Sequence, residues 1–473
     1  MMLQNDFQDD LNRLDAKDDD FLREALALLV QLDEQILSNP SVLRATIQRL
    51  ITEIDAKLSE QLSAIMHHED FKQLESSWRS IDSLVQLPIN KQKTKVRIID
   101  ISWNELSHDV NSSVSLKRSH LYNLLGNKEL NTSGGQPFGM IVVDHFVSID
   151  FDQDYDDVYT LELLASLGES CLCPFVLSPS DNFFGGGDAD WLSDTDRIEK
   201  ILYGPEFDAW QRLRKIPASR FLGLAMPKVK LRNSYQNFCS NFVFNETYQK
   251  ENGLWGSAAF MLASVAMREF NRISWFGFMK SRWQDQYYGA LVNVPPTGAG
   301  SFCTKKPITQ VNVITGMGAF YADQGFVPIC HSLMTDKYYL RGNNSIWDSG
   351  TNETDKVMGQ LQTTLMVCRI SHYLKVQIRS MIGNFQTAQE CEVYLNNWLD
   401  KYSSNLFNAD EKTLAKFPLS KGKVTVREVA GHQGRYVCDV LVQPQYQFDH
   451  VCGEVLLSTD IGPEDVSSRG VLS

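Results

Sequence analysis

Apolar residues recur at three- and four-residue spacing in two successive stretches near the start of the chain. The first stretch contains Phe21, Ala25, Leu28, Leu29, Leu32 and Ile36, and the second contains Leu43, Ile47, Leu50, Ile54, Leu58, Leu62 and Ile65. This spacing predicts two amphipathic helices. Asn39 and Pro40 suit the junction, as the cap and first residue of the second helix. We expect the two helices to form an antiparallel hairpin or a coiled-coil arm. Their apolar faces would pack either on partner helices or on the chain's own domain.

From about Lys91 the pattern changes to alternating strands and helices. Strands are predicted in KTKVRIIDI, at Met140–Val143, in CLCPFVLSP, in RFLGLAMPKV and in ADQGFVPIC. Helices are predicted to start at about Trp103, in VYTLELLASLGES and from Ser257 to about Ile273, and residues 181–204 resemble a loop. Alternation of this kind predicts a mixed α/β core.

The last third of the chain begins with a long predicted helix. It runs from about Lys356 to Ile382 and is ended by Gly383, and a further helix is predicted in CEVYLNNWLDKY. Short alternating segments follow in GKVTVREV, RYVCDVLVQP and HVCGEVLLST, which predict strands or extended arms. We expect a leader at 1–20, a helical arm at 21–88, a mixed α/β body at 89–355 and a C-terminal α/β region at 356–473.

Charge and composition narrow the classes of function. The chain of 473 residues has a formal net charge of −13, which argues against nucleic acid or anionic lipid as a general partner. Residues 1–20 alone carry seven acidic and two basic residues, which is typical of a mobile leader. Neither a secretory signal nor a membrane-spanning stretch is evident, so we expect a cytoplasmic protein. Nine cysteines, an odd number, favour reduced thiols over a disulfide framework.

A search for catalytic or cofactor-binding motifs finds none with the required spacing. His67 and His68 are adjacent and cannot share a helix face, and Cys171 and Cys173 have no second pair at zinc-finger spacing. Gly185–Gly187 lacks the Lys-Ser/Thr of a phosphate loop. We expect no cofactor, no metal and no enzyme. The alternative is a carboxylate-based hydrolase, because folding can bring two acidic residues together.

A basic stripe marks the long helix. Arg369, His372, Lys375 and Arg379 step by three, three and four residues and fall within a sector of roughly 120°. One interpretation is a solvated helix face. The other is contact with an acidic surface of a partner or a neighbouring copy.

The C-terminal strands suggest pairing between subunits. Val424 and Val426 alternate with polar residues, as do Tyr436, Cys438, Val440 and Val442, and glycines and prolines bound both sets. Unpaired edges of such short strands accept a strand from another chain. An ordinary internal sheet is the alternative.

Several segments, in collinear order, resemble one known family. The segment LSEQLSAIMHHEDFKQLESSWRSIDSLV, residues 58–85, is similar to the hallmark of the large contractile sheath subunit of type VI secretion systems, the TssC or VipB type. Further similar segments are GGQPFGMIVVDHF, LWGSAAF, CRISHYLKVQIRSMIGNF and LNNWLDKY, and the resemblance runs from about residue 45 to 458. It departs at Gln443 and Gln445, where the family shows Arg and His.

The hallmark residues are Phe71, Leu74, Glu75, Trp78 and Arg79. Phe71, Leu74 and Trp78 share one helix face, and we expect the whole set to be structural. If Trp78 is buried, replacing it with alanine costs roughly 3–5 kcal/mol.

The resemblance implies a mechanical function for a bacterial cytoplasmic protein of contractile-sheath fold with helical and β arms. Such a subunit pairs with a small sheath subunit of the TssB or VipA type. The heterodimers stack, together with further copies, into a helical sheath around a tube of Hcp, and contraction drives the tube outward. Baseplate proteins and a ClpV-type recycling ATPase are further implied partners. Nucleic acid and direct membrane insertion are not implied, and the sheath itself performs no catalysis.

Overall fold

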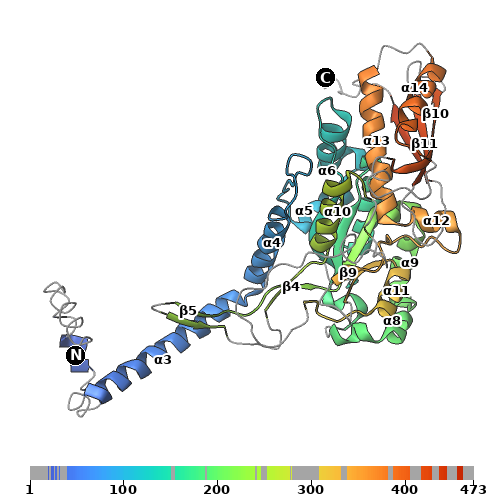
Figure 1. The fold of residues 1–473 in the computed structure, drawn as a ribbon. Coiled ribbons are helices and arrows are strands. Elements are labelled where there is room, and N and C mark those ends of the chain that lie inside the picture. Colours follow the sequence, from blue (N-terminus) through green and yellow to red (C-terminus); the bar gives the residue numbers. More distant parts are fainter. Residues whose placement is uncertain are drawn as a thin grey trace, which may run out of the picture. The chain divides into compact units, whose positions relative to one another are not determined.

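The chain is described by a computed structural model (Figure 1), which covers residues 20, 23–25, 27–28, 31, 40–150, 155–186, 189–239, 242–246, 253–276, 279, 308–331, 338–381, 387–404, 417–428, 436–444 and 455–461. It divides into two compact units. Unit 1 comprises Met1–Leu74 and Asn233–Gly253, and unit 2 comprises Glu75–Arg232 and Leu254–Ser473. The predicted leader, most of the predicted helix at 21–36 and residues 284–305 lie outside the described residues.

Unit 1 contains a long helix and a β-hairpin. Helix α3 (Pro40–Met66) begins at the predicted proline, and strands β5 (Gln236–Cys239) and β6 (Phe242–Asn245) pair antiparallel. Polar groups of α3 hold the hairpin: the Val243 N–H donates to Asp55 Oδ2 at 3.3 Å, and the Asn245 N–H donates to Ser59 Oγ at 3.3 Å. Helix α4 (Glu69–Val85) begins in unit 1.

Unit 2 is built on a five-stranded sheet in the order β1-β2-β3-β8-β9. Its strands are β1 (Ile141–Val147), β2 (Phe175–Pro179), β3 (Leu222–Met226), β8 (Phe326–His331) and β9 (Tyr338–Leu340). The first four pair in parallel and β9 is antiparallel to β8. Such a sheet, with helices between its parallel strands, confirms the predicted mixed α/β fold.

Helices cover both faces of this sheet. The α-helices that follow α4 are α5 (Trp103–Ser112), α6 (His120–Tyr122), α7 (Asp157–Cys171), α8 (Thr195–Leu202), α9 (Asp208–Lys215), α10 (Ala259–Ile273), α11 (Thr315–Asp323), α12 (Glu353–Met358), α13 (Leu361–Met381) and α14 (Ala388–Asp400). Short 3-10 helices occupy Leu116–Arg118, Asp181–Phe184, Ala189–Ser193, Pro205–Phe207 and Pro217–Phe221, and Asn123–Asn131 is the π-helix η3.

Alternate residues of the buried strands face two separate hydrophobic clusters. Val176 of β2 packs in a cluster with α10 and α13, whereas Phe175 and Leu177 pack in another with α7 and α9. The period of two along a strand produces this division. Because both faces are covered, β2 and β3 are buried along their whole length and are mostly apolar, and the hydroxyl of the buried Ser178 in β2 is hydrogen-bonded to that of Ser257 at 2.8 Å.

Two smaller sheets complete unit 2. Strands β4 (Val229–Arg232) and β7 (Leu254–Gly256) pair antiparallel, and near the C-terminus β10 (Leu419–Glu428), β11 (Tyr436–Pro444) and β12 (Val455–Ile461) form an antiparallel sheet in that order. Helix α14 packs against β10 (Figure 1).

Three predicted elements differ from the structure. Residues 95–102 form no strand, and residues 181–204 contain α8 rather than a continuous loop. The long helix is interrupted at Gly359, where Ser345 N–H donates to the Gly359 carbonyl at 2.7 Å and Leu361 N–H donates to Asn343 O at 2.7 Å. These bonds to a distant loop replace helical ones, so α12 and α13 are separate helices.

Candidate functional site: anchors and assembly surfaces

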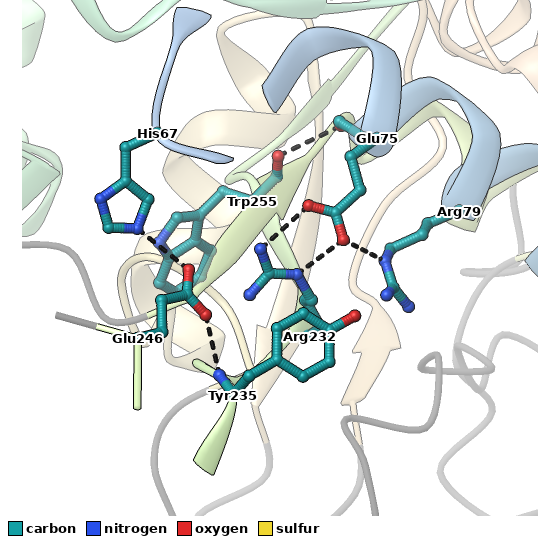
Figure 2. A network of polar contacts seen from close by, with 8 residues as sticks. His67, Glu75, Arg79, Arg232, Tyr235, Glu246 and Trp255 are labelled. Carbon is teal, nitrogen blue, oxygen red and sulfur yellow. Dashed lines mark hydrogen bonds and ion pairs between the residues drawn. The ribbon is translucent and has the colours of Figure 1, made fainter. Parts of the chain in front are cut away.

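The hallmark segment supplies a buried ionic anchor in unit 2. Figure 2 shows the Glu75 carboxylate of α4 accepting two hydrogen bonds from the last residue of β4, from Arg232 Nε at 2.7 Å and Nη2 at 2.9 Å. A third comes from Arg79 Nε at 2.7 Å, one helical turn along α4. Arg232 is buried and Glu75 nearly so. A bidentate, desolvated pair of this kind fixes α4 to β4 in one geometry.

The electrostatics of Glu75 follow from these partners. Burial acts to raise the pKa of its carboxyl, but the hydrogen bonds from Arg232 and Arg79 outweigh burial and hold the pKa below its ordinary value. The neighbouring Ser76 Oγ donates to the Trp255 carbonyl of β7 at 3.2 Å. Glu75 therefore stays ionised and joins α4 to β4 through Arg232, and the structural role expected of Glu75 and Arg79 stays a prediction.

Unit 1 has an anchor of its own. His67, which follows α3, contacts the buried Glu246 carboxylate with its Nε2 at 2.9 Å, and Glu246 also accepts from the Tyr235 N–H at 2.8 Å (Figure 2). The Glu246 N–H in turn donates to the Tyr235 carbonyl at 3.0 Å. His67 thus joins the end of α3 to the base of the hairpin.

Helix α3 exposes its apolar side chains and buries polar ones. The exposed fractions are 38% for Ile47, 50% for Ile51, 56% for Ile54, 47% for Leu58, 37% for Leu62 and 60% for Ile65. We call these six residues the α3 stripe. The buried residues of the same helix are Ser59, Ser63 and Met66. Intervals of four, three, four, four and three residues keep the stripe straight along the helix.

The hallmark apolar residues are also exposed. Phe71 is 39%, Leu74 is 55% and Trp78 is 60% exposed. Trp78 is therefore not buried, so the cost predicted for the case of a buried tryptophan does not apply. Helix α4 turns smaller residues inward instead, because Ser76, Ser80 and Leu84 are its buried positions.

The basic stripe on α13 is directed into unit 2 along part of its length. The Arg369 guanidinium lies over the rings of Tyr373 at 4.7 Å and Phe270 at 5.6 Å, and Lys375 Nζ donates to Asn131 Oδ1 at 3.3 Å. His372 is only 2% exposed. The expectation of a surface-exposed His372 is wrong. The side chain of Arg379 lies outside the described residues, and partner contacts by Arg369, Lys375 and Arg379 stay predictions.

Burial and charge keep His372 neutral. Its pKa is lowered from 6.5 to about 3, first by burial and then by the positive charges of Arg369 and Lys375. Neither ring nitrogen makes a hydrogen bond within the described residues, although the backbone of Cys171 and Leu172 at the end of α7 acts to raise the pKa.

The C-terminal strands pair within the chain. Val424 of β10 lies opposite Val440 of β11, and Val440 lies opposite Leu457 of β12. Strand β11 has neighbours on both sides, so its residues Tyr436, Val440 and Val442 offer no free main-chain edge to another subunit. The structure therefore has β11 inside a sheet of its own chain, and pairing between subunits through these residues stays a prediction.

Helix α14 covers part of the outer edge of β10. Asn396 accepts a hydrogen bond from the Val424 N–H at 2.8 Å and donates to the Val424 carbonyl at 2.7 Å, so one amide satisfies both main-chain groups. Glu392 Oε2 accepts from the Val426 N–H at 3.0 Å. These bonds occupy Val424 and Val426, and pairing between subunits stays a prediction for β12.

Catalytic chemistry has little support in the described part of the chain. There, no group of three or more His, Cys, Asp or Glu side chains is placed to hold a metal ion. Burial raises the pKa of the Cys171, Cys330 and Cys438 thiols to about 12, which makes them poor nucleophiles. Burial also raises the pKa of Asp144, whose carboxylate accepts from Ser77, but no second carboxylate joins it there.

Comparison with known proteins places the chain in a family. Residues 48–347 match the family model described as EvpB/VC_A0108, tail sheath N-terminal domain, and residues 350–461 match the tail sheath gpW/gp25-like domain of the same type. The chain belongs to this tail sheath family.

A relative in Pseudomonas aeruginosa agrees with that assignment. The chain is 29% identical over 430 residues to the type VI secretion system sheath protein TssC1 of Pseudomonas aeruginosa. The aligned region covers 88% of this chain and 85% of the relative. A sheath tail protein of Desulfitobacterium hafniense with a solved structure matches with 10% identity and a TM-score of 0.28. That match covers 66% of this chain and 62% of the other.

Two functional features of the sheath protein escaped sequence reasoning. Arg232 lies 157 positions from Glu75, so nothing local connects the pair. Asn396 and Glu392 lie four residues apart, so they share one helix face and can contact the same neighbouring element. The spacing alone does not show that this element is β10. Among the helices of the described residues, none has the length and hydropathy of a membrane-spanning segment.

Proposed function

We propose that this sheath protein is the large subunit of a type VI secretion contractile sheath and works in the bacterial cytoplasm. It pairs with a small sheath subunit, and the pairs stack with further copies around a tube of Hcp. The relative in Pseudomonas aeruginosa is named as a sheath protein of that secretion system. The role is mechanical, and the alternative of a carboxylate-based hydrolase has no support from the family.

The α3 stripe carries this proposal. Six apolar side chains, each between 37% and 60% exposed, line one side of a 27-residue helix, roughly 40 Å long at about 1.5 Å per residue. An ordered helix whose apolar face meets water is typical of a subunit that is completed by another chain. An amphipathic helix of the small subunit, laid along α3, is the partner that this straight stripe fits.

Contraction needs subunits that stay attached while they move. Main-chain pairing at the β12 edge suits this, because it depends little on side-chain identity. The Glu75–Arg232 anchor holds α4 to β4 within unit 2 at the same time, so the body moves as a rigid piece. We infer two alternative packings of the sheath, with energy stored in the less stable one. The tube of Hcp, baseplate proteins and a ClpV-type recycling ATPase complete this scheme as proposed partners.

Co-expression with the small sheath subunit tests the proposal. We expect long tubes by electron microscopy from the pair and none from either chain alone. A pair that remains two separate monomers in solution at micromolar concentration contradicts the proposal. As a matched control, Lys57→Asp places an aspartate on the polar side of α3 and should leave tubes intact.

A further inference from the structure

Residues 95–102, which connect α4 to α5, form an exposed apolar segment. All eight are exposed, and four are β-branched apolar residues: Val96 at 41%, Ile98 at 61%, Ile99 at 38% and Ile101 at 38%. The sequence predicts a strand here, yet the segment forms no helix, turn or strand. Side chains of this type in this number favour a pleated, half-buried surface, which this chain does not provide.

The main chain of this segment is open as well. Within the described residues, no backbone N–H or C=O of residues 95–101 takes part in a hydrogen bond. On either side the backbone is satisfied: Thr94 N–H donates to Asn90 O at 3.1 Å, and Leu106 N–H donates to Ser102 O at 3.0 Å. A row of free donors and acceptors is what a sheet edge offers to an incoming strand.

Polar contacts hold the segment in place without covering it. Arg97 Nη1 donates to Glu129 Oε1 at 2.6 Å, and Arg97 Nη2 and Lys95 Nζ both donate to Gln136 Oε1 at 3.2 Å. Glu129 is a buried residue of the π-helix η3 and also accepts from the Gln136 N–H at 2.8 Å. Residues 95 and 97 thus point the same way, which is the period of a strand.

We propose that residues 95–101, the acceptor segment, bind an extended strand of the small sheath subunit by main-chain pairing. The inference rests on the proposed function. Each described strand from β1 to β12 already belongs to a sheet within this chain, so a second copy could add only a remaining outer edge, such as that of β12. We therefore assign the acceptor segment to a strand of the small sheath subunit, and a second copy is the alternative that hydrogen exchange at rising concentration would reveal.

Charge specifies the chemistry of that strand. Lys91 and Lys93 are exposed just before the acceptor segment and Lys95 is exposed at its first position, and none of the three has an ion pair within the described residues of this acidic chain. The incoming strand should therefore carry acidic residues at the end that meets these lysines and β-branched or aromatic residues beyond them.

Hydrogen–deuterium exchange of the amides at 96–101 provides the first test. In the purified chain these amides should exchange at nearly unprotected rates, and in the co-expressed complex at least tenfold more slowly at alternate positions. Protection in the chain alone, at low concentration, means that its own residues cover the segment and overturns the proposal. Protection that appears only as the chain is concentrated points to a second copy and also overturns it.

A pair of proline variants separates main-chain pairing from simple side-chain burial. Successive N–H groups of a strand point to opposite edges, so Ile98→Pro and Ile99→Pro remove donors from different edges. We expect one variant to reduce affinity for the small subunit at least tenfold and the other to change it less than threefold, with unchanged melting of the chain alone. Equal losses, or no loss in either variant, contradict the proposal.

These outcomes are distinct from failure of the proposed function. If wild-type pairs form tubes while both proline variants and the exchange data show no effect, the chain is a sheath subunit and the acceptor segment has another role. If wild-type pairs form no tubes, the proposed function itself fails.

Discussion

Helices α3 and α13 both depart from the rule that polar residues face water, and they do so in opposite directions. Helix α3 exposes its apolar stripe and buries Ser59 and Ser63, whereas α13 buries Ser371 and His372 and turns Arg369 over aromatic rings. Lys375 of α13 donates to Asn131 of the same unit, whereas Ser371 Oγ and the ring nitrogens of His372 are buried without a hydrogen bond within the described residues. The apolar stripe of α3 is left uncovered. We infer that α13 is completed by its own chain and α3 by another.

The largest effect is expected from a double substitution in the α3 stripe. Replacing both Ile54 and Leu58 with aspartate should weaken association with the small subunit about 1000-fold, or about 4 kcal/mol, because two charges would be buried at the contact. The isolated chain should melt unchanged, since both residues are exposed. Titration of the purified subunits measures the affinity, with Lys57→Asp as the control. Wild-type affinity in the double variant would place the contact elsewhere.

Substitutions in the ionic anchor test how much the Glu75–Arg232 ion pair contributes to the stability of unit 2. Glu75→Gln keeps the shape but leaves Arg232 buried without its counter-ion, and it should lower the free energy of unfolding by about 3 kcal/mol. Arg79→Gln removes only the more exposed partner and should cost about 0.5 kcal/mol. Chemical denaturation of both variants measures the difference. Similar losses in the two would mean that Arg232 is not the dominant partner.

The edge of β10, like helix α13, is covered by residues of its own chain, and substitution of Asn396 tests how much this cover contributes to stability. Asn396→Ala leaves the N–H and C=O of Val424 without their partner, which should cost about 2 kcal/mol. Asn396→Asp retains an acceptor for the N–H and should cost less. Thermal unfolding and light scattering measure stability and edge-to-edge association. An alanine variant as stable as the wild type would show that water replaces the amide.

Acid titration probes the burial of His372. Its pKa is about 3 in the folded chain and near 6.5 when unfolded, so the unfolded state binds the extra proton between these values. This group's contribution to stability is complete above pH 6.5 and falls as the pH drops toward 3, by up to about 1.4 kcal/mol per pH unit. His372→Phe should remove that part of the slope. An identical pH dependence in both proteins would indicate that His372 reaches water.

The smallest effect on stability is expected at Trp78. Because this residue is 60% exposed, Trp78→Ala should change the free energy of unfolding of the isolated chain by only about 0.5 kcal/mol. Its loss should instead appear in assembly, as fewer or shorter tubes. A loss of several kcal/mol in the isolated chain would show that the Trp78 side chain is buried in solution.

The sequence alone determined the element types wherever a local period was strong. The helix that begins at Pro40, the buried strands β2 and β3 and the helices α7, α10 and α14 follow from spacing, caps and continuous apolar runs. The family resemblance also came from short segments, and the comparisons confirm it. These features depend on neighbours within a few residues, which the sequence displays directly.

Only the tertiary structure decided which face of each element is covered. The interruption at Gly359 depends on a loop at 343–345, the ionisation of Glu75 on Arg232, and the closed edge of β10 on Asn396. The apolar pattern of α3 and the basic pattern of α13 are visible in the sequence. In the structure, however, the apolar stripe of α3 is exposed, whereas His372 of α13 is buried and Arg369 lies over aromatic rings. An amphipathic pattern in the sequence predicts that one face of a helix or strand will be covered. Which element covers that face, in this chain or in another, depends on contacts between residues that are far apart in sequence.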